Sequence, residues 1–198
     1  MKILLFTSSI IFLFNISVAN NILEISKLDG WELLESNEVT VSYQYIDNIP
    51  YCKASTIYNI PSYKIKNTIE DLDKYAEIFK RMKFCNHLTE DIVHIQIDLP
   101  FPFYDRDYIV KHNHFKIDDS EYYMYTATTE KSAPLDKNSV RLYNASGIWK
   151  IDEIDAYTTK LTYTWNGELT GNIPNWALNT AWSMQGKEIL NWIKEGSK

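Results

Sequence analysis

The chain has 198 residues, which suffice for one domain with a sizeable core but not for two comfortable ones. Its formal net charge of −6 argues against a nucleic-acid binder and against permanent adhesion to anionic lipid head groups. Hydrophobic residues make up 45% of the chain and aromatic residues 14%. This aromatic content suits a thick core or a lined cavity, although a tyrosine-rich surface on ordinary strands is the plain alternative.

Residues 1–19 have the features of a secretory signal peptide. Lys2 provides the positive start, residues 3–14 form an apolar segment too short to span a bilayer well, and a small-x-small cleavage site ends at Ala19. No cysteine follows that site for lipid attachment. We therefore expect one exported domain, residues 20–198, which in a bacterium would be periplasmic or secreted.

The chain contains two cysteines, Cys52 and Cys85. In an oxidising compartment they could form a disulfide, which would add roughly 3–4 kcal/mol of stability in the chain-entropy model. Two separate buried thiols are the alternative. The spacing alone leaves the choice open, because geometry decides whether two cysteines can be bridged.

The first part of the mature chain predicts short helices around two strands. Residues 21–34 have the pattern of a weak amphipathic helix, interrupted at Asp29-Gly30, that would pack against a sheet edge. Apolar and polar residues alternate over 39–45, which indicates a half-buried strand, and a second strand is expected at 52–58. Pro61 opens a helix, and a second short helical run follows at 75–82.

The second part is dominated by strands. Residues 93–99 have the clearest alternation of apolar and polar side chains in the chain. Pro100 and Pro102 forbid a regular ladder directly after them. Residues 129–138 form a polar loop that contains a proline. The expected strands cover residues 93–99, 122–128, 140–150 and 157–165, together with one that resumes at 108–110 and continues to a turn at 118–120.

A long closing helix is predicted over 171–194, with Pro174 in its first turn, where a missing N–H is tolerated. Its apolar residues recur at steps of three and four and so share one face. Because most of the preceding chain is strand, the natural partner of this face is a curved antiparallel sheet, giving an α+β domain. The residues on the face are Leu178, Ala181, Trp182, Gln185, Ile189, Trp192 and Ile193.

Three local motifs add to this order of elements. Trp31 precedes the first strand and the helix opened by proline ends in the acidic segment 70–75. Residues 100–107 read PFPFYDRD, and residues 171–176 read GNIPNW at the start of the closing helix. Together they resemble the START (StAR-related lipid-transfer) domains of the helix-grip superfamily, with closest similarity to bacterial members of the exported type. Gly186 departs from the pattern, since the family often has a proline there.

The resemblance implies an internal cavity for one lipid or similarly apolar molecule, between the concave sheet face and the closing helix. Movement of that helix and of loop 129–138 would give access. Arg106 would point inward and pair with a buried acid, either as a polar anchor for the ligand or as a structural salt bridge. The candidate ligand-binding residues are Ile95, Arg106, Tyr108, Val110, Leu161, Tyr163, Trp165, Leu178, Trp182, Gln185 and Ile189.

The expected function is therefore non-catalytic binding of a lipid or other apolar molecule, with its transfer as an extension of that function. We expect a monomer that touches membranes only transiently. We expect no catalytic residues, no metal, no cofactor and no nucleic-acid partner. A cyclase-like or hydratase-like enzyme on the same fold is the alternative, with Tyr163, Tyr143, His112 or Asp98 as acid or base if they face inward. A binding module with a filled interior is a third hypothesis. His112 and His114 share a strand face as zinc ligands might, but no third ligand is placed nearby.

Overall fold

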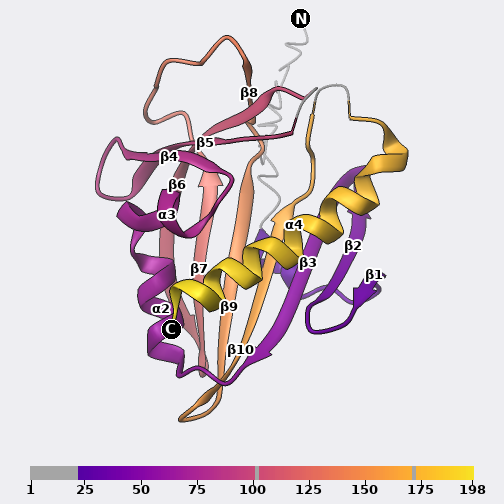
Figure 1. Cartoon of the computed structure of the whole chain (residues 1–198), viewed down its shortest axis with the longest axis vertical. Coiled ribbons are helices and arrows are strands. Elements are labelled where there is room, and N and C mark those ends of the chain that lie inside the picture. The colour runs from indigo at the N-terminus through magenta and orange to yellow at the C-terminus, as the bar shows by residue number, and fades with distance from the viewer. Residues whose placement is uncertain (1–21, 101–102, 171–172) are drawn as a thin grey trace, which may run out of the picture.

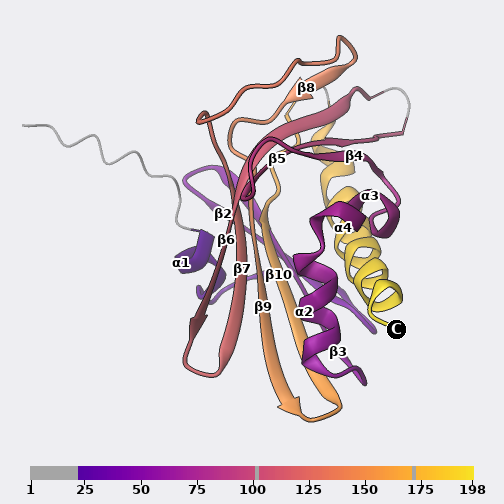
Figure 2. The ribbon, with the colours of Figure 1, turned by 90° about the vertical axis from the view of Figure 1, so that its left-hand side faces the viewer.

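Strands in which apolar and polar side chains alternate pair into one large sheet, and helices lie on both of its faces (Figures 1 and 2). The computed structural model describes residues 22–100, 103–170 and 173–198, so the predicted signal peptide lies outside the described residues. The helices are α1 (Ile22–Ser26), α2 (Ser62–Glu70), the 3₁₀ helix η1 (Leu72–Lys74), α3 (Tyr75–Ile78) and α4 (Asn175–Gly196). The strands are β1 (Glu32–Ser36), β2 (Thr40–Ile46), β3 (Ile49–Tyr58), β4 (Met82–His87), β5 (Ile92–Ile97), β6 (Asp105–Ile117), β7 (Ser120–Ala127), β8 (Ser139–Arg141), β9 (Ser146–Asp155) and β10 (Thr158–Asn166).

The strand order is β1-β2-β3-β10-β9-β7-β6-β5-β4, and every neighbouring pair in it is antiparallel. Strand β8 lies off this path and pairs in parallel with the start of β6. The register places Tyr163 of β10 between Ala54 of β3 and Trp149 of β9. The predicted α+β arrangement, a sheet closed by a long C-terminal helix, is confirmed.

Helices α2, α3 and α4 lie on one face of the sheet, and α1 lies on the other (Figure 2). Helix α4 begins directly after Pro174 and crosses the sheet diagonally (Figure 1). Trp182, Leu190 and Ile193 of α4 have no solvent exposure and belong to the main core. Within the part of the chain that the structure describes, no helix combines the length and apolarity needed to cross a membrane.

The N-terminal helix is shorter than predicted. It ends at Ser26, and residues 32–36 form the edge strand β1. The break follows from Gly30, whose φ of +82° is open to glycine but ends a right-handed helix. The predicted edge packing is also wrong, because Ile22 and Ile25 cover the sheet face opposite α4, near β9 and β10.

Two predicted elements further along the chain are divided in the structure. The helical run expected at 75–82 ends at Ile78, because Phe79 adopts an extended conformation and the chain enters β4, which pairs with β5. The strand expected at 140–150 is split into β8 and β9. The first difference comes from the hairpin of β4 with β5, and the second from the pairing of β8 with the more distant β6. Local alternation reports neither pairing.

Cys52 and Cys85 are free thiols. Cys52 lies on β3 and Cys85 on β4, and five strands separate them in the sheet order. A direct disulfide would need two neighbouring Cβ atoms, so this topology explains why the two thiols stay apart.

Gly186 lets α4 approach the sheet closely. A Cβ at this position would lie 3.1 Å from the Cβ of Ala54 and 3.1 Å from Cγ2 of Val41, both of which are fully buried. We expect Gly186→Ala to lower the midpoint of thermal unfolding. Overpacking costs roughly 1–3 kcal/mol, whereas the gain in helix propensity is about 1 kcal/mol.

Asn179→Ala, at an exposed position of the same helix, is the matched control and should keep or raise the midpoint. If Gly186→Ala raised the midpoint as much as this control does, the tight helix–sheet contact at Gly186 would be refuted.

Candidate ligand cavity

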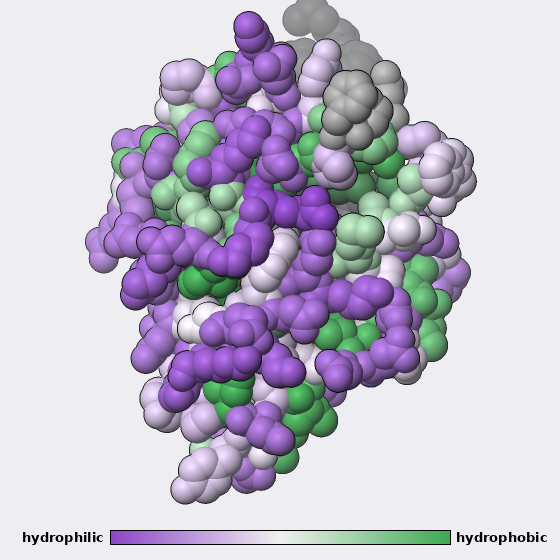
Figure 3. All heavy atoms as spheres, in the orientation of Figure 1, coloured by the Kyte–Doolittle hydropathy of each residue, from purple (hydrophilic) through white to green (hydrophobic). Residues whose placement is uncertain are grey.

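A cavity of about 390 Å³ lies between α4 and the sheet. The sheet contributes its wall from β5, β6, β7, β9 and β10, and α3 and β4 close one side. Most of the lining is aromatic or aliphatic. Hydrophilic residues cover much of the outer face on the α4 side, with apolar residues visible between them (Figure 3).

The period of each element decides which side chains reach the cavity. Along β6, Arg106, Tyr108 and His112 are separated by even numbers of residues and therefore share the face toward α4. Along α4, the lining residues recur at steps of three and four. These helix residues are Ala177, Ala181, Met184, Gln185, Glu188, Ile189 and Trp192.

An aromatic stack forms the sheet side of the cavity. The ring of Tyr163 lies 4.1 Å from that of Trp149 and 5.0 Å from that of Trp165, centroid to centroid. The indole Nε1 of Trp165 donates to Oε1 of Gln185 across the cavity edge at 3.1 Å. This hydrogen bond connects the aromatic stack to α4 and occupies the side-chain amide oxygen of Gln185, which was predicted to bind the ligand.

Two tyrosine hydroxyls meet within the lining. The hydroxyl oxygens of Tyr125 and Tyr163 are 2.5 Å apart, and burial raises the pKa of Tyr125 to about 12. Gly147 makes room for the Tyr125 ring, because a Cβ there would lie 2.6 Å from its atoms. The two phenols therefore share one hydrogen bond, and burial keeps both protonated at neutral pH.

His112 is the polar residue of the wall that lacks a partner. Its Nε2 atom is buried and makes no hydrogen bond within the described chain. The rings of Tyr125 and Tyr75 lie 5.9 and 6.4 Å from the imidazole. Burial lowers the pKa of His112 to about 4, so the imidazole is neutral at physiological pH.

Three arginines border the cavity, and each is engaged by protein groups. Arg81 forms two hydrogen bonds to the carboxylate of Glu188, at 2.7 and 2.8 Å. Arg141 pairs with the buried Asp107, whose other oxygen lies 2.5 Å from Nε2 of His94. The carboxylates thus neutralise two of the three guanidinium groups.

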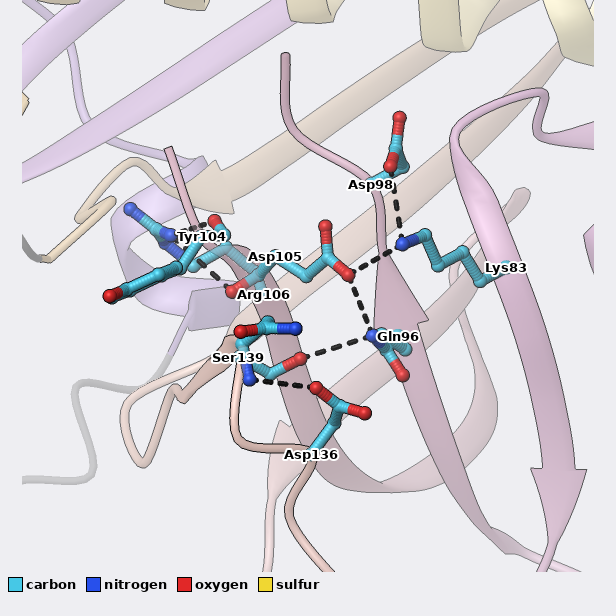
Figure 4. A network of polar contacts seen from close by, with 9 residues as sticks. Lys83, Gln96, Asp98, Tyr104, Asp105, Arg106, Asp136 and Ser139 are labelled. Atoms are coloured by element: carbon cyan, nitrogen blue, oxygen red, sulfur yellow. Dashed lines mark hydrogen bonds and ion pairs between the residues drawn. The ribbon is translucent and has the colours of Figure 1, made fainter. Parts of the chain in front are cut away.

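Arg106 is 4% exposed, and the prediction that it pairs with a buried acid is wrong. Its Nε and Nη2 atoms donate to the carbonyls of Leu169 and Thr170, each at 2.6 Å, and Nη1 donates to the carbonyl of Tyr104 at 2.5 Å (Figure 4). Burial lowers its pKa from the usual value. Asp105 and Asp107 cannot reach the guanidinium, because neighbours on a strand face opposite sides.

A polar network on the face of β5 and β6 away from the cavity connects these strands to β8 and the adjacent loop (Figure 4). Oδ2 of Asp105 accepts hydrogen bonds from Lys83 and Gln96, both at 2.7 Å. Gln96 also donates to the hydroxyl of Ser139 on β8 at 3.0 Å. This network fixes the strand ends that frame one side of the cavity.

Seven of the eleven predicted site residues border the cavity: Ile95, Arg106, Tyr108, Tyr163, Trp165, Gln185 and Ile189. Val110, Leu161, Leu178 and Trp182 lie outside its described lining. Val110 is fully buried in a cluster with Val93 and Ile95, and Leu72 of η1 packs against this cluster. Leu161, Leu178 and Trp182 belong to the main core, where the Trp182 ring lies 5.3 Å from Tyr43.

The other candidate residues have separate surroundings. Tyr143 borders the cavity but is 74% exposed, and Asp98 pairs with Lys83 at 3.3 Å. His114 lies 2.8 Å from Glu121, and the described residues hold no cluster of three metal-ligating side chains.

Sequence reasoning missed lining residues on elements it misjudged, namely Tyr75, Phe79 and Met82. It also missed Tyr125 and Trp149, although the alternation along β7 and β9 could have indicated them. Both lie on strands whose inward face the sequence pattern marks.

No protein-family model matches the chain, and a search of curated protein sequences finds no match. Solved structures do match. Human STARD10 has a TM-score of 0.75 at 16% identity, covering 92% of this chain and 79% of its own. Human StAR-related lipid transfer protein 5 has a TM-score of 0.75 at 13% identity, covering 91% of this chain and 93% of its own.

A STAR-related lipid transfer protein from Xanthomonas axonopodis has a TM-score of 0.72 at 18% identity, covering 85% of this chain and 99% of its own. Similarity at these identities establishes the fold and leaves activity to be argued from the site. The chain therefore has the START-like helix-grip fold, with a long C-terminal helix packed on a large sheet.

Proposed function

We propose that the protein binds one lipid or similar apolar molecule in the cavity between α4 and the sheet. The observation that carries this proposal is the apolar volume of about 390 Å³, which lies within the range of about 300–1,000 Å³ typical of small-molecule sites. Each CH₂ group of a ligand buried there would contribute roughly 0.8 kcal/mol. Burial of apolar surface is thus the driving force of binding.

Transfer of that ligand between membranes is a further part of the proposal. The matched structures from human and Xanthomonas axonopodis are named as lipid transfer proteins, which supports it by analogy of fold. Tyr143 and Trp176 are 74% and 83% exposed, at the cavity border and in the first turn of α4. They provide apolar contacts for the transient membrane encounter, and residues 1–19 support export.

We propose binding without catalysis. The buried carboxylate–histidine pair, Asp107 and His94, alternates with the cavity residues along β6 and β5 and so belongs to the opposite face of the sheet. His112 does border the cavity, but it has no carboxylate partner among the described residues. A general base normally needs an orienting group of that kind.

The direct test is native mass spectrometry of the protein purified from its own compartment. A bound apolar molecule should appear as a mass shift and be identified after extraction. An unliganded mass, together with failure to bind any member of a broad lipid panel, would overturn the proposed function.

Ala181 leaves space on the helix side of the cavity, so Ala181→Phe should fill it. If the larger ring displaces two CH₂ equivalents of ligand, affinity for the neutral fluorophore N-phenyl-1-naphthylamine should fall about tenfold. The midpoint of thermal unfolding should stay the same or rise, because an apolar void is filled.

Thr180→Phe adds the same ring at the exposed neighbouring position and should leave affinity unchanged. Equal affinities for Ala181→Phe and the unmodified protein would show that the fluorophore binds elsewhere.

We infer that Arg106 holds the segment after β10 rather than a ligand head group. Its planar guanidinium serves three carbonyls at once, which one lysine ammonium could not do in the same geometry. Arg106→Lys should therefore cost roughly 1–3 kcal/mol of stability, because buried carbonyls lose their donors. Amide hydrogen exchange of residues 166–170 should accelerate locally.

The matched control is Arg81→Lys, since Arg81 pairs with a carboxylate that a lysine can still engage. Unchanged exchange at 166–170 combined with lost ligand affinity would mean that Arg106 contacts the ligand instead.

A further inference from the structure

We propose that His112 selects the ligand: its Nε2 atom forms a hydrogen bond with a hydroxyl group, so the ligand is an apolar molecule carrying an uncharged hydroxyl. This inference rests on the proposed function and names the ligand class for the same cavity.

His112 has a buried side-chain atom without a hydrogen-bond partner among the described residues. Three buried side-chain atoms of the described residues have no partner, namely Oε1 of Gln44, Nε2 of His112 and Oγ1 of Thr164. Of the three residues, His112 alone borders the cavity. Native proteins rarely leave such atoms unpaired, because the lost hydration is not replaced. A ligand group is the partner that the cavity itself can receive.

His112 lies where the cavity meets a second hollow. A second hollow of about 210 Å³ shares Tyr75, His112, Tyr125 and Trp149 with the main cavity. These four side chains therefore form a wall between the two spaces. His112 follows Arg106 by six residues on β6, which corresponds to roughly 20 Å of strand. The unpaired nitrogen thus lies far from the Arg106 end of the cavity.

The charged groups around the cavity favour an uncharged ligand group beside His112. The guanidinium groups of Arg81 and Arg141 pair with carboxylates, and Arg106 is engaged by carbonyls. The imidazole of His112 is neutral at physiological pH because burial lowers its pKa to about 4. A charged ligand group beside His112 would lose its hydration without gaining an opposite charge.

Among uncharged groups, a hydroxyl is the best match for Nε2 of His112. Nε2 is a donor in one neutral tautomer of histidine and an acceptor in the other. A hydroxyl can both donate and accept, so it satisfies Nε2 in either tautomer. The adjacent hydroxyls of Tyr125 and Tyr163 share one hydrogen bond, whereas Nε2 of His112 has no partner among the described residues.

The test compares naphthalene, 2-naphthol, 2-naphthoate and 2-naphthylmethylammonium, which share one ring system and differ in the polar group. Dissociation constants come from NMR titration of the full mature protein. The ¹⁵N shift of His112 Nε2 reports directly on its hydrogen bond. We expect 2-naphthol to bind roughly three- to tenfold more tightly than naphthalene, as one net hydrogen bond provides. The Nε2 signal should move with 2-naphthol and not with naphthalene.

His112→Phe should reduce the affinity ratio of 2-naphthol to naphthalene to about one while naphthalene affinity stays within about twofold. His114→Phe is the matched control, because His114 is on the same strand face but borders the second hollow and not the main cavity. It should preserve the ratio. If His112→Phe does not fold, the Nε2 shift in the unmodified protein decides the question.

Equal binding of 2-naphthol and naphthalene with an unmoved Nε2 signal would overturn the inference and leave the proposed function standing. Tightest binding of the naphthoate or the ammonium compound would also overturn it. Failure of all four compounds to bind would instead count against the proposed function itself.

Discussion

The architecture depends on two neighbouring stripes of α4 that are offset by one residue. Leu178, Trp182 and Gly186 recur at four-residue steps in the stripe that packs into the main core over β2 and β3. Ala177 and Ala181 begin the adjacent stripe, which borders the cavity. Both stripes follow the same helical period, so they run side by side along the helix. One helix therefore closes the core and leaves a space beside it.

All three arginines at the border of the cavity are engaged by protein groups. Glu188 balances Arg81, Asp107 balances Arg141, and backbone carbonyls surround Arg106. A buried charge without partners would be costly, so these contacts are a condition for an apolar interior and also fix the surrounding strands and loops. The exception is the neutral His112, whose Nε2 remains unpaired. Most of the lining is thus apolar and suits an apolar molecule, whereas His112 offers one unpaired polar atom.

Sequence periodicity predicted which face of a strand a side chain lies on, but not which distant element packs over that face. Alternation placed Tyr163 on the apolar face of its strand, and the resemblance added Tyr108; both border the cavity. Val110 has the same parity as Tyr108, yet it is buried in an apolar cluster outside the cavity lining, and no local pattern reports which distant element lies above a strand. The partners of Arg106 were equally hidden, because Leu169 lies 63 residues away and offers only its backbone. Short edge strands such as β1 depend on pairing rather than on their own composition.

The central claim is that the space beside α4 is a stable, apolar cavity able to hold a guest. Diffraction from crystals of the ligand-free protein under xenon pressure tests this most directly, since xenon enters dry apolar cavities. The account predicts xenon density between Tyr163 and Ala181 without rearrangement of α4. Absence of xenon there, with side chains or ordered water filling the space, would contradict it.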